Sequence, residues 1–231
     1  MKIKSLGLDQ KNNKNISFKA REYAVIKTTV NGITTNLKAY EIGFEDTRFL
    51  DLMASKLNLL SLYGNKKIVT PKQNHDWLAS INNAIMMAGF NEPQHSFLLT
   101  KDKRPCGIMS YKNLKKCYLD YIVTWPFAKG STVKLAGKSM MKMMYEDCIA
   151  SNTSVIMLDL LDKMSQKLKT FYKSLDFIEN IGPDSMGCDM YISRHNFMRK
   201  SRELDAFINV EKVKISKQIN LKEILDIDFN K

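Results

Sequence analysis

A strand, helix, strand run in the second half of the chain most constrains its fold. Cys117 to Trp125 is rich in strand-forming residues. Gly137 to Asn152 is expected to be a helix whose inward-facing residues are Met140, Met141, Met144, Cys148 and Ile149. Val155 to Leu158 is continuously apolar, which is typical of a strand covered on both faces. The three segments together predict a crossover connection, and therefore an α/β domain.

The elements before this crossover are mostly strands. Tyr23 to Ile42 consists of two β-rich runs around Asn31-Gly32, a dipeptide that tolerates the positive φ angles of a tight turn, so we expect an antiparallel hairpin. A helix is expected over Glu45 to Leu62, with Phe49, Leu52 and Met53 at helical spacing, and another over Pro71 to Gly89, with Ile81, Ile85 and Met86 in an apolar stripe. Strands are expected over Ser96 to Thr100 and Cys106 to Tyr111, which form an antiparallel meander with the strand from Cys117.

A helix and two strands are expected after the crossover. Asp162 can cap a helix whose buried face holds Met164, Leu168, Phe171 and Leu175. The final strands are predicted around Phe177 to Ile181 and Cys188 to Ser193. We divide the chain into a polar N-terminal extension over residues 1–20, one folded domain over 21–194, and a charged extension over 195–231 that docks on the domain.

Composition limits the classes of function. The chain has 231 residues and a formal net charge of +12. This charge is compatible with nucleic acid, an acidic protein, an anionic membrane or a polyphosphate cofactor, and equally with a lysine-rich surface that binds none of them. Its four cysteines and three histidines lack the spacing of a metal site, so no metal is expected. The start of the chain lacks the apolar run of a secretory signal, and no apolar stretch is long enough to span a bilayer. We expect a cytoplasmic protein, a monomer or homodimer, with no membrane partner.

Two segments carry a resemblance to a known family. The order of elements, the run Ile122 to Pro126 and the loop Lys134 to Ser139, with the sequence KLAGKS, resemble the GNAT superfamily of N-acetyltransferases. The loop is similar to that family's pattern of Arg or Gln, two residues, Gly, one residue, then Gly or Ala; here Ser139 replaces the last small residue. The resemblance implies a mixed, largely antiparallel sheet, with flanking helices and with splayed parallel fourth and fifth strands.

The loop has a physical rationale. A pyrophosphate needs several backbone N–H donors at once, and glycine lets the backbone approach it at a helix N-terminus. An alternative register that begins at Lys129-Gly130 avoids an insertion but loses the second glycine. The resemblance implies that acetyl-CoA is held by Ile122, Val123, Thr124, Lys134, Leu135, Ala136, Gly137, Lys138, Ser139 and Ser165.

A second motif concerns the end of the following helix. Phe171 to Phe177, with the sequence FYKSLDF, resembles the family's tyrosine-bearing helix that ends in Leu-Gly-Phe, with Asp176 in place of the glycine. Helical spacing puts Tyr172 beside the buried stripe, on the side of Ser165 and Leu168, from which it can face the cofactor. The resemblance implies that Tyr172 is the general acid that reprotonates the coenzyme A thiolate.

The general base has a weaker signal. An amine acceptor must lose a proton, and a carboxylate near the splayed strands could take it. Asp120 is the candidate, because strand alternation puts it on the face of Tyr118, Ile122 and Thr124. Asp159 on the neighbouring strand is the reserve, and a salt bridge to a surface lysine is the competing interpretation of Asp120.

The predicted function is therefore acetyl-CoA-dependent N-acetylation of an amine on a small molecule, peptide or protein, by direct transfer in a ternary complex. One alternative is a non-catalytic domain that binds acyl-CoA as a sensor or interaction module. A basic nucleic-acid-binding protein ranks lower, because aromatic residues do not alternate with the basic ones.

Overall fold

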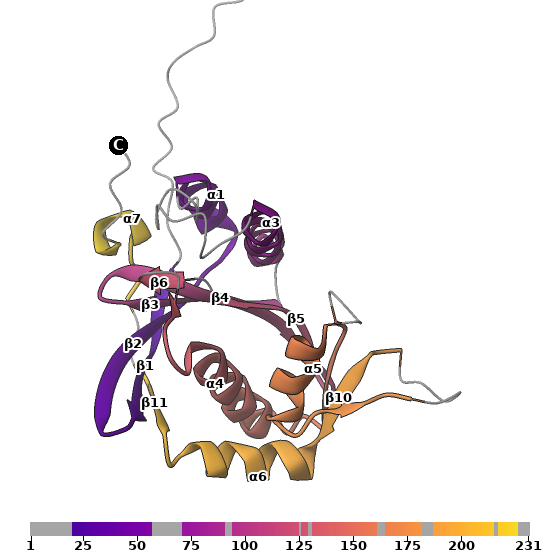
Figure 1. Ribbon diagram of the computed structural model, residues 1–231. Helices are drawn as coiled ribbons and strands as arrows, with labels where there is room; N and C mark the ends of the chain where they lie inside the picture. Colours follow the sequence, from indigo (N-terminus) through magenta and orange to yellow (C-terminus); the bar gives the residue numbers. More distant parts are fainter. Residues whose placement is uncertain are drawn as a thin grey trace, which may run out of the picture.

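A nine-stranded sheet separates two layers of helices. The computed structural model describes residues 20–56, 71–90, 94–124, 126–128, 131–160, 165–181, 187–214 and 217–225. The sheet order is β11-β1-β2-β3-β4-β5-β8-β10-β9. In Figure 1, α1 and α3 cover one face, while α4, α5 and α6 lie on the other. The predicted N-terminal extension lies outside the described residues, apart from Ala20.

The predicted N-terminal hairpin is confirmed. Strands β1 (Arg21–Val30) and β2 (Ile33–Glu41) pair antiparallel. Asn31 and Gly32 have φ angles of 52° and 76°, the left-handed conformation for which this dipeptide is suited. The two turn residues thus set the hairpin register, in which Val30 pairs with Ile33.

The first helical layer buries one stripe of each helix against the sheet. A short 3-10 turn, η1 (Phe44–Asp46), precedes α1 (Thr47–Lys56), and α3 spans Pro71–Ala88. Two residues predicted on the buried faces point to solvent instead: Leu52 is 47% exposed and Met86 is 57% exposed. The predicted part of the first helix beyond Lys56 lies outside the described residues. The side chains that are buried as predicted are Phe49, Met53, Ile81 and Ile85.

The meander and the crossover follow as predicted. Strands β3 (Gln94–Lys101), β4 (Arg104–Asn113) and β5 (Cys117–Thr124) form an antiparallel meander. Helix α4 (Ala136–Ala150) then leads to β8 (Val155–Leu158), which pairs in parallel with β5. Between β5 and α4, β6 (Pro126–Ala128) and β7 (Ser131–Thr132) form a separate two-stranded sheet. Of the predicted inward residues of α4, Met140, Met141, Met144 and Cys148 are buried, and the partly buried Ile149 packs on the same core.

The next helix begins later than expected. Helix α5 spans Gln166–Lys173, and its N-cap is Ser165, whose hydroxyl oxygen accepts a hydrogen bond from the Leu168 backbone N–H. The predicted cap, Asp162, lies outside the described residues, and the observed cap is Ser165 instead. A serine oxygen three residues before a free N–H satisfies the same requirement. Strands β9 (Ile178–Glu179) and β10 (Met190–Ser193) complete this end of the sheet.

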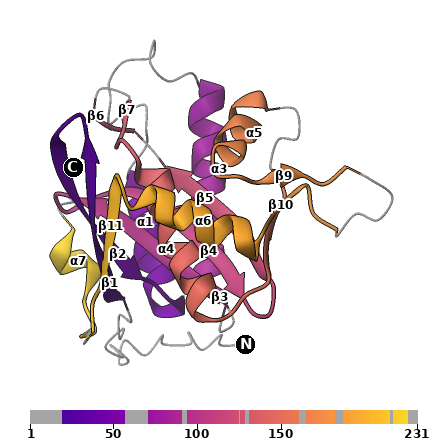
Figure 2. The same cartoon turned by 90° about the horizontal axis from the view of Figure 1, so that it is seen from below.

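The C-terminal segment adds to the sheet as well as to the helical layer. Helix α6 (Arg194–Leu204) crosses α4, and β11 (Ile208–Lys212) pairs antiparallel with β1, as Figure 2 shows from below. A short helix, α7 (Leu221–Ile224), follows. Within the described part of the chain, no helix combines the length and apolar character needed to cross a membrane.

Candidate active site

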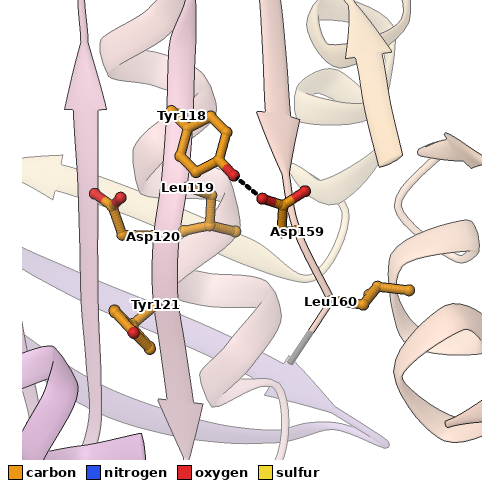
Figure 3. Close-up of a pocket in the computed structure, with 6 residues that line it drawn as sticks. All are labelled: Tyr118, Leu119, Asp120, Tyr121, Asp159 and Leu160. Carbon is orange, nitrogen blue, oxygen red and sulfur yellow. Dashed lines mark hydrogen bonds between the residues drawn. The ribbon is translucent and has the colours of Figure 1, made fainter. Parts of the chain in front are cut away.

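A pocket lies where the two parallel strands stop pairing. Their register joins Cys117 to Ile156, Tyr118 to Met157 and Leu119 to Leu158, and the described residues form no later pair. The next residue of each segment carries a carboxylate: Asp120 after Leu119 and Asp159 after Leu158. Figure 3 shows both carboxylates beside the opening. The pocket has a volume of about 190 Å³ and is lined by Tyr118, Leu119, Asp120, Tyr121, Asp159 and Leu160.

Asp159 is fixed by donors from two elements. The Tyr118 hydroxyl donates to its Oδ2 atom, and the Asp189 backbone N–H donates to its Oδ1 atom at 3.0 Å. The Asp189 carboxylate in turn accepts the Leu160 backbone N–H at 2.9 Å. Burial and the bond to Asp159 raise the pKa of Tyr118 well above its ordinary range, so that hydroxyl keeps its proton. Asp159 is therefore held as an acceptor that already has its donors.

Asp120 has a less complete set of partners. The Gln94 Nε2 atom donates to Asp120 Oδ2 at 3.0 Å, and the Lys112 Nζ atom lies 3.8 Å from Oδ1. Burial raises the pKa of this carboxyl group, and the contacts with Gln94 and Lys112 oppose that rise. A carboxylate with a raised pKa beside a pocket is suited to accept a proton near neutral pH.

A β-bulge corrects the predicted face of Asp120. On β4, Ser110 pairs with Tyr121 and Tyr111 pairs with Leu119, so Asp120 is an extra residue in β5. Alternation therefore changes phase: Ile122 packs on the α4-side core, whereas Val123 belongs to the core beneath α1 and α3. Asp120 does not share its face with Ile122 and Thr124, as predicted, but lies on the α3 side with Gln94.

The predicted phosphate loop forms the first turn of α4. Leu135 adopts a left-handed conformation, with φ 62°, and the Ser139 N–H donates to the Leu135 carbonyl at 2.7 Å. A Cβ atom added at Gly137 would lie 3.2 Å from Phe171 Cζ and 3.8 Å from Thr124 Cγ2. The fold thus brings together Gly137, the end of β5 and the start of the Tyr172 motif.

The other loop positions differ in accessibility. Lys134 is exposed, Lys138 is half-buried and Ala136 is buried. Ser139 is fully buried, and its Oγ atom has no hydrogen-bond partner among the described residues. Within the same described part of the chain, no acceptor is found for the backbone N–H groups of Gly137 and Lys138, so this helix N-terminus can still receive an anion. The alternative register at Lys129-Gly130 lies outside the described residues.

Tyr172 is more deeply placed than its helical position predicted. It was expected beside the buried stripe, but it is only 7% exposed and belongs to the α4-side core. Its ring meets Phe171 and Phe177 edge to face, with centroids 5.2 Å and 5.6 Å away. Burial raises the pKa of Tyr172 well above its ordinary range, which keeps the hydroxyl protonated. The short helix turns this ring inward, toward the aromatic residues that close its C-terminal end.

Several residues in or next to the pocket had no clear sequence signal. Gln94 precedes the predicted start of its strand at Ser96, and its contact with Asp120 spans two strand pairings. Tyr121 reaches the pocket face because of the bulge, which no local pattern indicated. The place of Leu160 in the pocket could have been predicted, because this residue follows the buried strand by two positions. Sites lie just beyond the carboxyl ends of parallel strands.

Comparisons with known proteins support the fold. No protein-family model matches the sequence, and no curated protein matches it. An uncharacterized protein from Bacillus halodurans covers 80% of this chain and 98% of its own, with a TM-score of 0.51 and 11% identity. The N-acetyltransferase PaiA from Thermoplasma acidophilum, solved in complex with coenzyme A, covers 68% of this chain and 98% of its own, with a TM-score of 0.45 and 16% identity. A GNAT-family acetyltransferase from Staphylococcus aureus covers 68% and 99%, with a TM-score of 0.44 and 17% identity.

The fold is similar to that of the uncharacterized Bacillus halodurans protein. Its features are an antiparallel meander, a crossover helix, a parallel strand pair that opens beyond Leu119 and Leu158, and helices on both faces. The predicted mixed, largely antiparallel sheet with flanking helices and one splayed parallel strand pair is confirmed.

Proposed function

We propose that this protein is an acetyl-CoA-dependent N-acetyltransferase that transfers the acetyl group directly to an amine. The observation that carries the proposal is the end of the parallel pairing at Leu119 and Leu158, with Asp120 immediately beyond it. An opening between parallel strands provides a site at their carboxyl ends, and Asp120 supplies a proton acceptor there. The acceptor is an amine on a small molecule, peptide or protein.

The chain's own residues fit acetyl-CoA. The first turn of α4 offers the N–H groups of Gly137 and Lys138 to a pyrophosphate, and the lysines at 134 and 138 add positive charge. The absence of a Cβ atom at Gly137 lets the first turn of α4 pack closely on the Phe171 ring, beside Thr124 at the end of β5. The backbone of Ile122 to Thr124 would bind the pantetheine arm as an added strand does. When bound, the cofactor supplies an acetyl thioester.

In this mechanism Asp120 and Tyr172 hold protons at opposite stages. Asp120 takes the proton that the acceptor amine loses as its nitrogen attacks, and its raised pKa suits this task. A backbone N–H of β5 polarises the acetyl carbonyl. Tyr172, which burial keeps protonated, returns a proton to the departing sulfur. The bond from carbon to nitrogen forms as the bond from carbon to sulfur breaks, and the enzyme forms no covalent bond with the acetyl group.

Thiol release tests this function. Free coenzyme A would be measured after the protein is incubated with acetyl-CoA and a panel of amines, alongside calorimetric binding of acetyl-CoA. We expect amine-dependent release that is lost in Asp120→Asn while cofactor binding is kept. Binding without release on any amine would instead support the non-catalytic acyl-CoA module. Steeply salt-dependent binding of nucleic acid, without cofactor binding, would support a basic nucleic-acid-binding protein.

A further inference from the structure

We propose that Gln94 is a positioning residue, whose side-chain amide orients the Asp120 carboxylate toward the acceptor amine. The inference rests on the proposed acetyl transfer, because it assigns Asp120 the proton. Gln94 itself does not line the pocket, so it acts through Asp120. Gln94 lies outside the segments that carry the resemblance to the GNAT superfamily.

The contact is direct and buried. Gln94 is the first residue of β3 and is only 8% exposed, and its Nε2 atom lies 3.0 Å from Asp120 Oδ2. The Asp120 side chain is 10% exposed, so water competes weakly for this bond. A charge-assisted hydrogen bond in such a place fixes the plane of a carboxylate that would otherwise rotate.

The far end of the same amide gives independent support. Gln94 Oε1 is buried and has no hydrogen-bond partner among the described residues. A buried acceptor without a partner destabilises a fold, and such atoms are rare in native structures. Rotating the amide would direct Oε1 at the Asp120 oxygen, and two acceptors would then repel. The amide orientation is therefore set by Asp120, at the expense of its own oxygen.

The bulge and Lys112 complete the arrangement. Because Asp120 is the extra residue in β5, its side chain turns toward β3 and β4, where Gln94 and Lys112 are cross-strand partners. Lys112 is 47% exposed and 3.8 Å from Oδ1, beyond hydrogen-bond distance, so it contributes charge more than orientation. Gln94 binds one carboxylate oxygen and leaves the other for the acceptor.

The charged and titratable groups around Asp120 determine the direction of a pH effect. Lys112 on β4 favours the ionised form, whereas Tyr118 and Tyr121 on β5 and Asp159, directly after β8, line the same pocket. On α3, the described titratable side chains, His75 and Asp76, are exposed near the start of the helix. Loss of the Gln94 donor removes a contact that lowers the pKa of Asp120, so this pKa must rise.

The test replaces Gln94 by an apolar residue of similar shape. In Gln94→Met, we expect the acidic limb of the kcat/KM profile to move up by about one pH unit, the order of effect for one hydrogen bond to a charged group. The control is Ser96→Ala on the same strand, which removes a buried hydroxyl that bonds Ser110 at 2.7 Å and does not touch Asp120. Its acidic limb should stay in place.

A titration without turnover separates this inference from the proposed function. Carbon-13 NMR of the aspartate carboxyl groups, with Asp120→Asn to assign the signal, should show the same upward shift of the Asp120 pKa in Gln94→Met. Equal pKa values and equal limbs in wild type and Gln94→Met would overturn the positioning role, even if acetyl transfer occurs. A shifted NMR pKa without any acetyl transfer would keep the contact but contradict the function, and with it the role assigned to Gln94.

Discussion

Two aspartates in this molecule lie beside tyrosines, yet their surroundings differ in one respect. Asp147 on α4 accepts hydrogen bonds from the hydroxyls of Tyr23 and Tyr111, and it forms an ion pair with Lys212 on β11. Asp120 accepts one side-chain hydrogen bond, from Gln94, and faces a pocket. The first carboxylate has its oxygens occupied, whereas the second has an oxygen left over.

The difference separates structure from chemistry. Asp147 joins β1, β4 and β11 to α4, and burial together with this carboxylate raises the pKa of Tyr23 and of Tyr111. These hydroxyls therefore stay protonated and keep donating to Asp147. We call the cluster of Asp147, Tyr23, Tyr111 and Lys212 the hub. Asp120 has too few donors to offset its burial, which leaves its pKa raised and its oxygen available. An incompletely satisfied carboxylate at an opening is suited to proton transfer, and a saturated one to stability.

Asp120→Asn should produce the largest effect on activity. The amide can still accept the Gln94 hydrogen bond but cannot take a proton, so we expect kcat/KM for acetyl transfer to fall by about 10²- to 10⁴-fold. The pKa of Asp120 is higher in the folded state than in the unfolded state. Between these two pKa values, a rise in pH therefore lowers the free energy of unfolding of the wild type. The variant should therefore unfold at an equal or higher denaturant concentration at pH 7. Unchanged kcat/KM would remove Asp120 from the mechanism.

Asp147→Ala should show the opposite division between stability and catalysis. It leaves the hydroxyls of the buried Tyr111 and the half-buried Tyr23, and one lysine, without their shared acceptor, which should lower the free energy of unfolding by about 3 kcal/mol. Urea denaturation would measure the loss. At a temperature where the variant remains folded, kcat/KM should stay within a few-fold of wild type. A selective loss of activity with full stability would break the distinction between the two aspartates.

Lys212→Met sharpens the comparison by removing only one donor from the hub. Lys212 is 40% exposed, so solvent screens its ion pair with Asp147, and the expected loss is about 0.5 kcal/mol. The long apolar side chain preserves the packing over Tyr23. Lys27→Met, on the exposed pair with Glu211, is the matched control for a surface charge. If Lys212→Met lowered the free energy of unfolding much more than the control, Lys212 would stabilise the hub more than the two tyrosines do.

The sequence predicts the frame better than the site. Asn31-Gly32 fixed the hairpin, and the apolar run at Val155 to Leu158 located a strand with its observed bounds, because local conformation and periodicity decide both. The bulge at Asp120 and its bond to Gln94 depend on register across three strands, which no local pattern records. Tyr172 was placed by helical spacing alone, and the packing of Phe171 and Phe177 decided its burial.

The smallest expected effect concerns Ser139, where the loop departs from the family pattern. Its hydroxyl is fully buried, and Oγ has no partner among the described residues, so it contributes desolvation cost without a hydrogen bond. Ser139→Ala keeps the backbone N–H that bonds the Leu135 carbonyl and should raise the free energy of unfolding by up to about 1 kcal/mol. Affinity for acetyl-CoA, measured by calorimetry, should not change, because backbone groups hold the pyrophosphate in the proposed mode. If affinity instead fell tenfold, the Ser139 hydroxyl would be a cofactor ligand. This buried polar group would then serve the site, as Asp120 does, and not the stability of the fold, as Asp147 does.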